Sequence, residues 1–232
     1  MSFPKGEIPM KGRHEWKHEI TVMDYLEIRM RMKAVASVDP HAKNGKYRIR
    51  SLYFDTPTDK ALREKIDGVA NREKFRIRFY NNDVSLIHLE KKANHHELSY
   101  KPSVSLTSEE AKRIAEGEIG WMQHDERDLL RELHFKMITT GLAAKTIVDY
   151  DREPFVFAPG NVRVTLDHHI KTGVASTDFL NPDVPMVPVE DNPIILEVKW
   201  DDYLPDIIRM AVGLYHRRVQ AYSKYAAARM YD

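Results

Sequence analysis

Charged residues alternate with apolar ones in several short segments of this chain, and the charged positions hold Arg, Lys and Glu. The clearest segment is Ile194–Trp200, in which Val198 separates Glu197 from Lys199. Side chains of a β-strand alternate between its two faces, so Glu197 and Lys199 share one face and the apolar residues share the other. The same alternation recurs in segments 74–79, 90–92 and 163–167.

These residue types suit the binding of phosphate and a metal ion. The planar guanidinium of Arg binds phosphate oxygens bidentately, and Lys supplies a mobile positive charge. Carboxylates bind hard divalent cations, whose remaining ligands are phosphate oxygens and water. Strands that bring these side chains to one shared face therefore predict a site for phosphate chains together with Mg²⁺ or Mn²⁺.

The spacing of apolar residues predicts one α+β domain over residues 1–232, with about eight strands and five or six helices. We expect strands at 13–20, 47–55, 72–80, 84–92, 97–103, 144–152, 162–170 and 194–201. We expect helices after Thr21, at 59–67, after Thr107 or Ser108, and at 126–140, 204–214 and 219–231. Strand 47–55 has mixed faces because Arg48 and Arg50 share a side with apolar residues, which predicts either a bulge or a change of environment.

The shared charged face allows two interpretations. An antiparallel sheet commonly leaves one face in solvent, and that face is polar. An enclosed face is favoured here because most of the expected strands share the pattern and because Arg, Lys and Glu replace the Thr and Tyr that strands prefer. The expected helices also carry one-sided apolar stripes that can cover an oily outer face. About eight strands would close into an antiparallel β-barrel or tunnel with a charged interior, wide enough for one slender ligand.

The composition excludes several classes of protein. The 232 residues are 42% hydrophobic and 31% charged, yet the net charge is only +1, which argues against a general polycation for nucleic acid or membrane surfaces. There is no Cys, so disulfides and thiolate metal sites are excluded. No segment resembles a signal peptide or a membrane span, and we expect a cytoplasmic protein without membrane insertion.

Two other signals are set aside. The histidine pairs His95-His96 and His168-His169 are not expected to bind metal, because neighbours on a strand face opposite ways. The aromatic residues within 74–80 fall on the face opposite the arginines, which argues against stacking with single-stranded nucleic acid.

The sequence resembles the VTC domain (vacuolar transporter chaperone), the polyphosphate-polymerase branch of the triphosphate tunnel metalloenzymes. Nine segments carry the resemblance in order: RHEWK (13–17), RSLYFDTP (50–57), REKFRIR (72–78), LEKK (89–92), YKP (100–102), YDR (150–152), VRVTLD (162–167), LEVK (196–199) and SKY (223–225). The triphosphatase and adenylyl-cyclase branch has Glu-x-Glu-x-Lys on its first strand. This chain has Arg13-x-Glu15-x-Lys17 instead, which favours the VTC branch.

The resemblance implies an eight-stranded tunnel flanked by helices and the transfer of the terminal phosphoryl group of a nucleoside triphosphate, usually ATP, to polyphosphate. It implies that the catalytic group is Arg76, Arg78, Lys92, Arg152, Arg163 and Lys224. Further substrate contacts are expected from Arg13, Lys17, Lys101, Lys199 and Tyr150. The metal, Mn²⁺ or Mg²⁺, is expected at Glu197, with Glu15 and Glu90 as further ligands or outer partners.

Three functions stay open from the sequence. The first is an ATP-dependent polyphosphate polymerase, the second a tripolyphosphate or nucleoside-triphosphate hydrolase in the same tunnel, and the third a non-catalytic polyphosphate-binding module. The sequence shows neither a regulatory phosphate-sensing domain nor a membrane anchor. It does not identify a membrane-protein partner.

Overall fold

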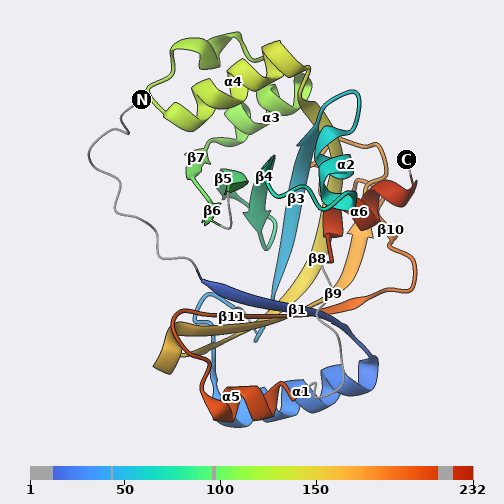
Figure 1. Cartoon of the computed structure of the whole chain (residues 1–232). Coiled ribbons are helices and arrows are strands. Elements are labelled where there is room, and N and C mark those ends of the chain that lie inside the picture. The colour runs from blue at the N-terminus through green and yellow to red at the C-terminus, as the bar shows by residue number, and fades with distance from the viewer. Residues whose placement is uncertain (1–12, 43, 96–97, 214–221, 232) are drawn as a thin grey trace.

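The computed structural model describes residues 13–231, apart from 43, 96–97 and 214–221. Its centre is one antiparallel sheet of eleven strands (Figure 1). The strands are β1 (His14–Ile20), β2 (Ser37–Val38), β3 (Tyr47–Asp55), β4 (Arg72–Tyr80), β5 (Asp83–His95), β6 (Leu98–Tyr100), β7 (Ser103–Leu106), β8 (Ala143–Phe157), β9 (Val162–Thr172), β10 (Val187–Pro188) and β11 (Ile194–Trp200). The helices are α1 (Val22–Val35), α2 (Lys60–Ile66), α3 (Ser108–Glu116), α4 (Asp128–Thr140), α5 (Asp206–Ala211) and α6 (Lys224–Ala228).

The sheet confirms the expected α+β class and the antiparallel pairing, but it is not a closed barrel. Its main path is β1-β11-β9-β8-β3-β4-β5-β6, while β2, β7 and β10 pair beside it. Within the described residues no ladder joins β1 to β6, so the two ends of the path stay open. Figure 1 shows the sheet bent, with β1 and β11 crossing below and β3, β4 and β5 standing above.

Helices cover the outer face of the sheet at both ends. The apolar stripe expected for the first helix is wrong, however, because Val22, Met23, Leu26 and Met30 are exposed and another face of α1 is buried. Below the sheet, Ile28 and Met32 of α1 and Ile208 of α5 pack in one buried cluster with Leu196 and Val198 of β11. Above it, α3 and α4 pack in a second cluster against the apolar side of β4 and β5. Because alternate residues face the opposite way, both ends of the sheet turn their charged side chains inward.

The helix starts follow from the caps that the sequence predicted. Thr21 accepts a hydrogen bond from the backbone N–H of Asp24 at 3.2 Å, and the Asp24 carboxylate accepts one from the Thr21 N–H at 2.9 Å. Thr107 and Glu110 form the same reciprocal box at the start of α3. Each box satisfies backbone donors that have no partner inside the helix.

A third buried cluster closes one part of the inner face. Tyr225 and Ala228 of α6 pack there with Tyr53, Tyr150 and Ile195. The Tyr225 hydroxyl donates to Asp55 Oδ2 at 2.7 Å. The same carboxylate accepts from two backbone N–H groups at the start of α2, so one buried side chain joins β3, α2 and α6.

The mixed faces of β3 reflect a change of environment. Arg50 is only 1% exposed, and it donates to both oxygens of Asp149 at 2.9 and 3.0 Å. Arg50 also donates to the backbone carbonyls of Phe179 and Asn181, so its buried guanidinium has hydrogen-bond partners on the outer side of the sheet. The register of β3 against β8 shifts at Tyr53.

The prediction that His168 and His169 face opposite ways is wrong. The β8–β9 ladder pairs Asp149 with Lys171 but Asp151 with His168, so β9 carries one extra residue. His169 takes the left-handed conformation at φ 53°. A bulge of this kind cancels the alternation locally, and the two imidazole rings lie with their centroids 4.5 Å apart.

Other element boundaries differ from the sequence-based ones. The described part of the predicted strand 97–103 is divided between β6 and β7, and β2 and β10 were not predicted. Strand β8 continues to Phe157, five residues beyond the predicted end at 152. The last helix begins at Lys224 after its cap at Ser223, later than predicted, and the predicted start at 219, like His96, lies outside the described residues. Among the described helices, none has the length and apolar character needed to cross a membrane.

We expect Asp149→Leu to lower the free energy of unfolding by about 3–5 kcal/mol, because it leaves the buried Arg50 guanidinium without a counter-charge. Urea unfolding measures the change. The control is Arg31→Gln, which removes an exposed pair with Glu27 in α1 and should cost at most about 0.5 kcal/mol. Equal effects of the two variants would contradict a structural role for the Arg50–Asp149 pair.

Candidate functional site

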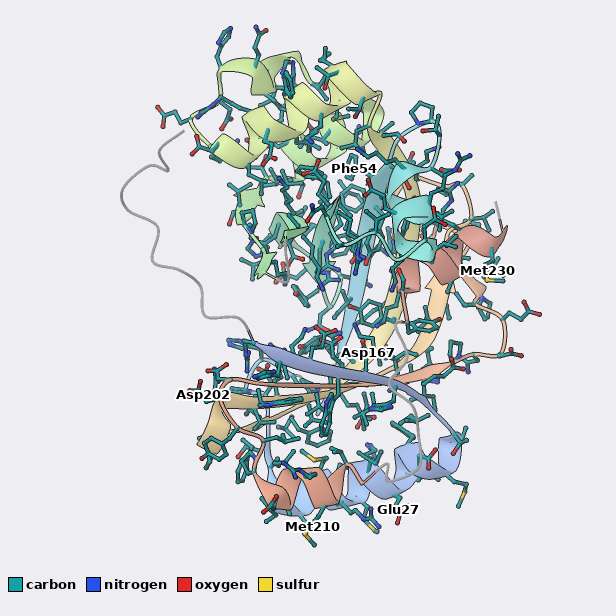
Figure 2. The ribbon with its side chains drawn as sticks, viewed as in Figure 1. Glu27, Phe54, Asp167, Asp202, Met210 and Met230 are labelled. Atoms are coloured by element: carbon teal, nitrogen blue, oxygen red, sulfur yellow. The ribbon has the colours of Figure 1, made fainter. Side chains whose placement is uncertain are left out.

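Charged side chains from both halves of the sheet meet on its inner face, the side turned away from α1, α3, α4 and α5. Asp167 lies between the two halves in Figure 2, whereas Glu27 and Met210 lie on the outer helices. The inner face carries three charged groups: Glu15, Lys17, Glu197 and Lys199; Arg76, Arg78 and Glu90; and Arg152, Asp167 and Lys224. Each group joins residues from neighbouring strands or from α6.

The first group is a square of two carboxylates and two amines on β1 and β11. Lys17 Nζ lies 2.8 Å from Glu15 Oε1 and 3.2 Å from Glu197 Oε2. Lys199 Nζ contacts Glu197 and lies 3.6 Å from Glu15 Oε2. The ladder dictates this arrangement, because it places Lys17 opposite Glu197 and Glu15 opposite Lys199.

Glu15, Lys17 and Glu197 of this square are ionised at neutral pH, because the pKa values of both carboxyls are lowered and that of the amine is raised. Burial alone would raise the pKa of Glu197, but Lys17 and Lys199 hold that pKa well below its usual range. Burial would lower the pKa of Lys17, and the carboxylates of Glu197 and Glu15 raise it instead. Two ionised carboxylates on adjacent strands are a ligand pair suited to a hard divalent cation.

The second group lies on β4 and β5. Arg76 Nε donates to Glu90 Oε2 at 2.7 Å, and its Nη1 donates to the Tyr53 hydroxyl at 3.1 Å. Arg78 donates to Ser51 and Tyr150. Burial opposes ionisation of Glu90, but Arg76 and Arg78 lower its pKa to about 2. Two guanidinium groups against one carboxylate leave a net positive surface.

The third group joins β8, β9 and α6. Arg152 grips both oxygens of Asp167 at 2.6 and 2.7 Å. Lys224 Nζ lies 2.6 Å from Asp167 Oδ2 and 4.6 Å from the centre of the Tyr150 ring. Ser223 caps α6 by accepting from the Ala226 N–H, and this cap fixes the helix turn from which Lys224 reaches inward.

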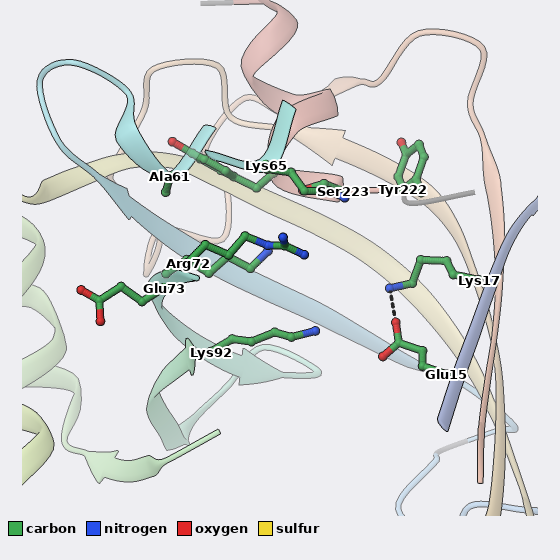
Figure 3. Close-up of a pocket in the computed structure, with 11 residues that line it drawn as sticks. Glu15, Lys17, Ala61, Lys65, Arg72, Glu73, Lys92, Tyr222 and Ser223 are labelled. Atoms are coloured by element: carbon green, nitrogen blue, oxygen red, sulfur yellow. Dashed lines mark hydrogen bonds and ion pairs between the residues drawn. The ribbon is translucent and has the colours of Figure 1, made fainter. Parts of the chain in front are cut away.

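Cations from the upper half face the square across a cavity of about 340 Å³. Figure 3 shows Lys92 of β5 extending toward Lys17 and Glu15 of β1. Lys65, Arg72 and Lys74 also line this cavity. The negative charge of Glu15 opposes the lowering of the Lys92 pKa by burial, although the two residues belong to strands near opposite ends of the sheet. The bend of the sheet brings them to the same cavity.

Two of the sequence-predicted residues, Arg13 and Arg163, stand apart from these groups, and Lys101 meets the second group only at its edge. Arg13 pairs with Asp201 at 2.8 Å and donates to the Asn161 carbonyl. Arg163 reaches Asp39 at 3.2 Å and the Tyr47 hydroxyl at 2.5 Å, and its Nε is buried without a hydrogen-bond partner among the described residues. Lys101 lies at the rim, half exposed and 3.5 Å from Glu90.

The three predicted metal ligands do not all lie in one group. Glu15 and Glu197 share Lys17 and Lys199, whereas the contacts of Glu90 are with Arg76, Arg78 and Lys101. The structure therefore brings together two of the three predicted carboxylates.

Several inner-face residues were missed by the sequence analysis. Lys74 alternates with Arg76 and Arg78 on β4, so the signal was present in the strand pattern. Asp167 alternates with Arg163 on β9 in the same way. Tyr53 has no such signal, because its role follows from the ladder that places it opposite Arg76.

Comparisons with known proteins agree with this geometry. The family model of the VTC domain matches residues 12–231. A search of the curated proteins finds no match. Among solved structures, a candidate adenylate cyclase from Bacillus halodurans is 13% identical, with a TM-score of 0.50 and 81% of each chain covered. A candidate adenylyl cyclase from Hippeastrum with a dominant triphosphatase activity is 11% identical, with a TM-score of 0.53 and coverage of 93% of this chain and 94% of that one. Both likenesses concern the fold.

Burial lowers the pKa of Lys74 to about 8, and repulsion from Arg76 and Lys92 adds to this effect. The amine is a cation below that pH and neutral above it. We therefore expect wild-type affinity for inorganic tripolyphosphate to fall relative to Lys74→Arg between about pH 7 and about pH 9. The expected change is up to about tenfold, equivalent to about 1.4 kcal/mol.

Isothermal titration calorimetry measures this difference, and titration of the ligand itself cancels between the two proteins. Lys112→Arg on the exposed face of α3 is the matched control and should follow the wild type. Parallel profiles for wild type and Lys74→Arg would exclude Lys74 from the anion site.

Proposed function

This chain belongs to the VTC domain family, and we propose that it is a metal-dependent phosphotransferase that moves the terminal phosphoryl group of ATP to a polyphosphate chain. The observation that carries the proposal is the composition of the inner face. Arginines and lysines from β1, β4, β5, β8, β11 and α6 converge there, and two adjacent carboxylates stand among them.

Glu15 and Glu197 fit the divalent cation that the family suggests. Both are ionised, adjacent and partly enclosed, and Mg²⁺ or Mn²⁺ is commonly held by one or two carboxylates together with substrate phosphates. When bound, the metal would neutralise negative charge on the phosphate oxygens. Its binding would also release Lys17 and Lys199 from their carboxylate partners, so that both amines can meet phosphate oxygens.

Arg76 and Arg78 suit the grip on the triphosphate. Both are enclosed on β4, and each guanidinium can offer two parallel N–H groups to phosphate oxygens. Lys74 and Lys92 extend the same positive surface toward the square. A phosphate chain along this face would offset the repulsion between these cations, which at about 4 Å amounts to about 4 kcal/mol per pair at an effective dielectric of 20.

The transfer itself needs no nucleophile from the protein. A terminal oxygen of the polyphosphate chain, already anionic at neutral pH, forms a bond to the γ-phosphorus of ATP. The bond from that phosphorus to the β–γ bridging oxygen breaks, and its electron pair leaves with ADP. Catalysis of this kind is mostly alignment and charge stabilisation, which fixed arginines and lysines supply.

The packed side of the inner face supports chain transfer over hydrolysis. Tyr53, Tyr150, Ile195 and Tyr225 form a buried wall beside the charged groups, and the hydroxyls of its tyrosines already have hydrogen-bond partners. A wall of this kind limits the water near the reacting phosphorus. A triphosphatase on the same face is the second candidate, and the product of the reaction decides between the two.

Purified protein with labelled ATP and Mn²⁺ or Mg²⁺ should yield labelled polymer and ADP, resolved by electrophoresis. Free labelled phosphate without polymer would instead assign the hydrolase. Tight polyphosphate binding with neither product would assign the binding module and end the proposal of catalysis.

Glu197→Gln should lower synthesis by more than about 100-fold, because it removes one of two metal ligands. Arg76→Ala should raise the KM for ATP by about tenfold or more, through loss of a charge-assisted contact. Glu116→Gln and Arg131→Ala, on α3 and α4, are matched controls and should retain wild-type rates. Thermal unfolding of each variant separates loss of activity from loss of fold, and wild-type kinetics in folded Glu197→Gln and Arg76→Ala would refute these roles.

A further inference from the structure

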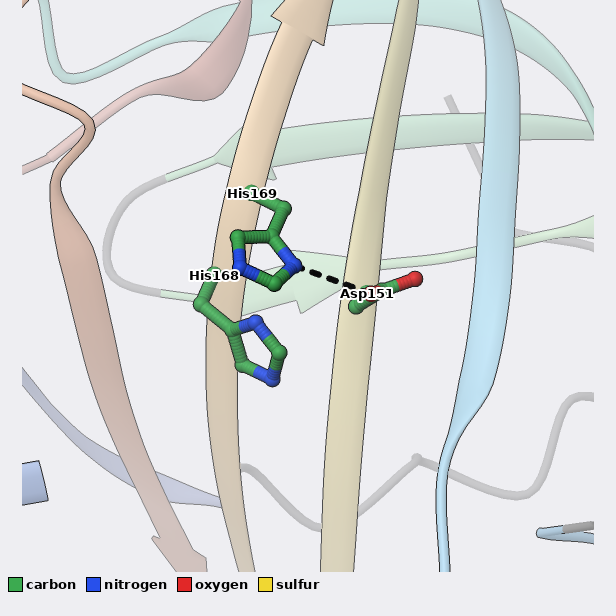
Figure 4. A group of neighbouring side chains, drawn as sticks. All are labelled: Asp151, His168 and His169. Carbon is green, nitrogen blue, oxygen red and sulfur yellow. Dashed lines mark hydrogen bonds and ion pairs between the residues drawn. The ribbon is translucent and has the colours of Figure 1, made fainter. Parts of the chain in front are cut away.

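A second cluster of metal-ligand side chains lies at the β8–β9 bulge, among residues to which the proposed reaction gives no role. Asp151, His168 and His169 each present one ligand atom, and these three atoms all lie within 4.8 Å of one another (Figure 4). His169 Nδ1 is 3.1 Å from Asp151 Oδ2. In a tetrahedral zinc site, ligand atoms about 2.0–2.1 Å from the metal are about 3.3 Å apart. The His169–Asp151 pair is close to that spacing before any ion binds, and the ligand atom of His168 lies within 4.8 Å of both.

The bulge is what assembles the cluster. A regular strand would send His168 and His169 to opposite faces. The extra residue in β9 and the left-handed backbone of His169 turn its ring back over Asp151 of the neighbouring strand. Bulges re-aim side chains in this way, and His is one of the few residue types that often adopts positive φ.

A carboxylate lies beside the buried histidine, whose Nε2 has no hydrogen-bond partner among the described residues. His168 Nε2 lies 3.5 Å from Glu153 Oε1. Glu153 is in turn held by Arg29 Nε of α1 at 2.5 Å and by the Tyr25 hydroxyl. In Figure 4 the other ring nitrogen of His168 lies on the side of His169. Carboxylates that bind the distal nitrogen of a metal-ligating histidine are a regular feature of zinc sites.

The cluster differs in ligand chemistry from the square on the inner face. Two imidazoles and one carboxylate suit Zn²⁺ and similar first-row metals, whereas oxygen-only sets suit Mg²⁺ and Mn²⁺. The His169 side chain is 58% exposed, which gives an ion access from solvent. Lys46 lies 3.3 Å from Asp151 Oδ2, but this amine is half exposed and free to turn away.

We propose that Asp151, His168 and His169 form a binding site for Zn²⁺, with Glu153 as the outer partner of His168 and water completing the coordination. The bound ion would clamp β8 to β9 at the bulge. The residues next in sequence, Arg152 and Asp167, form the bidentate pair on the inner face. The site therefore stabilises the strand register that presents this pair.

Untagged protein stripped with chelator is titrated with Zn²⁺ in competition with a chromogenic chelator, and with Co²⁺ followed by visible absorption. We expect one site with the d–d bands of tetrahedral Co²⁺. His169→Ala and Asp151→Asn, both at solvent-accessible positions, should each weaken binding by more than about tenfold, and Glu153→Gln by about tenfold or more. His168→Ala should abolish binding, and circular dichroism checks that it folds.

Two controls locate the ion. His124→Ala alters an exposed histidine in the turn Gly120–His124 and should leave Zn²⁺ affinity unchanged. Glu197→Gln removes a carboxylate of the square and should also leave it unchanged. The proposal is overturned if folded His169→Ala and Asp151→Asn bind Zn²⁺ as the wild type does, or if only Glu197→Gln loses it. Because Zn²⁺ binding is measured without ATP, failure here is distinct from failure of the proposed transfer.

Discussion

Neutralisation of charge between adjacent strands is the interaction on which the inner face depends. A buried unpaired charge costs several kcal/mol, so counter-charges stand beside most of the lysines and arginines that line this enclosed surface. The ladders supply those neighbours: Lys17 faces Glu197 across β1 and β11, and Arg76 faces Glu90 across β4 and β5. Asp167 serves both Arg152 and Lys224. The chain can thus hold a highly charged face in a folded state before any ligand binds.

The same pairing explains how the face can exchange partners. Each carboxylate on it already neutralises at least one cation. A phosphate chain with a divalent cation brings both signs of charge together, so it can replace protein–protein pairs without leaving a protein charge unpaired. Lys74, Lys92 and Lys101 have lowered pKa values because burial and neighbouring cations oppose their ionisation, so a bound polyanion would favour their charged forms.

A buried ion pair on β3 and a bulge in β9 determine what lies outside the charged face. On the outer side of β3, Arg50 is buried against Asp149. The register of β3 against β8 shifts a few residues later, beside Tyr53. The β9 bulge places two consecutive histidines on one side, directly behind Arg152 and Asp167. Strict alternation accounts for Arg50, which shares its side with Leu52 and Phe54, but it would not bring the two histidines together. These two places are also where charged side chains leave the inner face and take a role in the packing or in the proposed zinc site.

The sequence alone determined the strand faces, the helix caps and most of the charged set, because alternation and capping depend only on residues a few positions apart. It therefore predicted Glu197, Lys199, Arg76 and Arg78 together, and the family resemblance added Lys224. Only the tertiary structure decided which carboxylates meet, since Glu15 joins Glu197 through strand pairing across most of the chain while Glu90 joins the arginines. It also decided that the sheet bends without closing and that His168 and His169 share a side. Strand register, bulges and sheet curvature arise from contacts between distant segments, and no local pattern in the sequence encodes them.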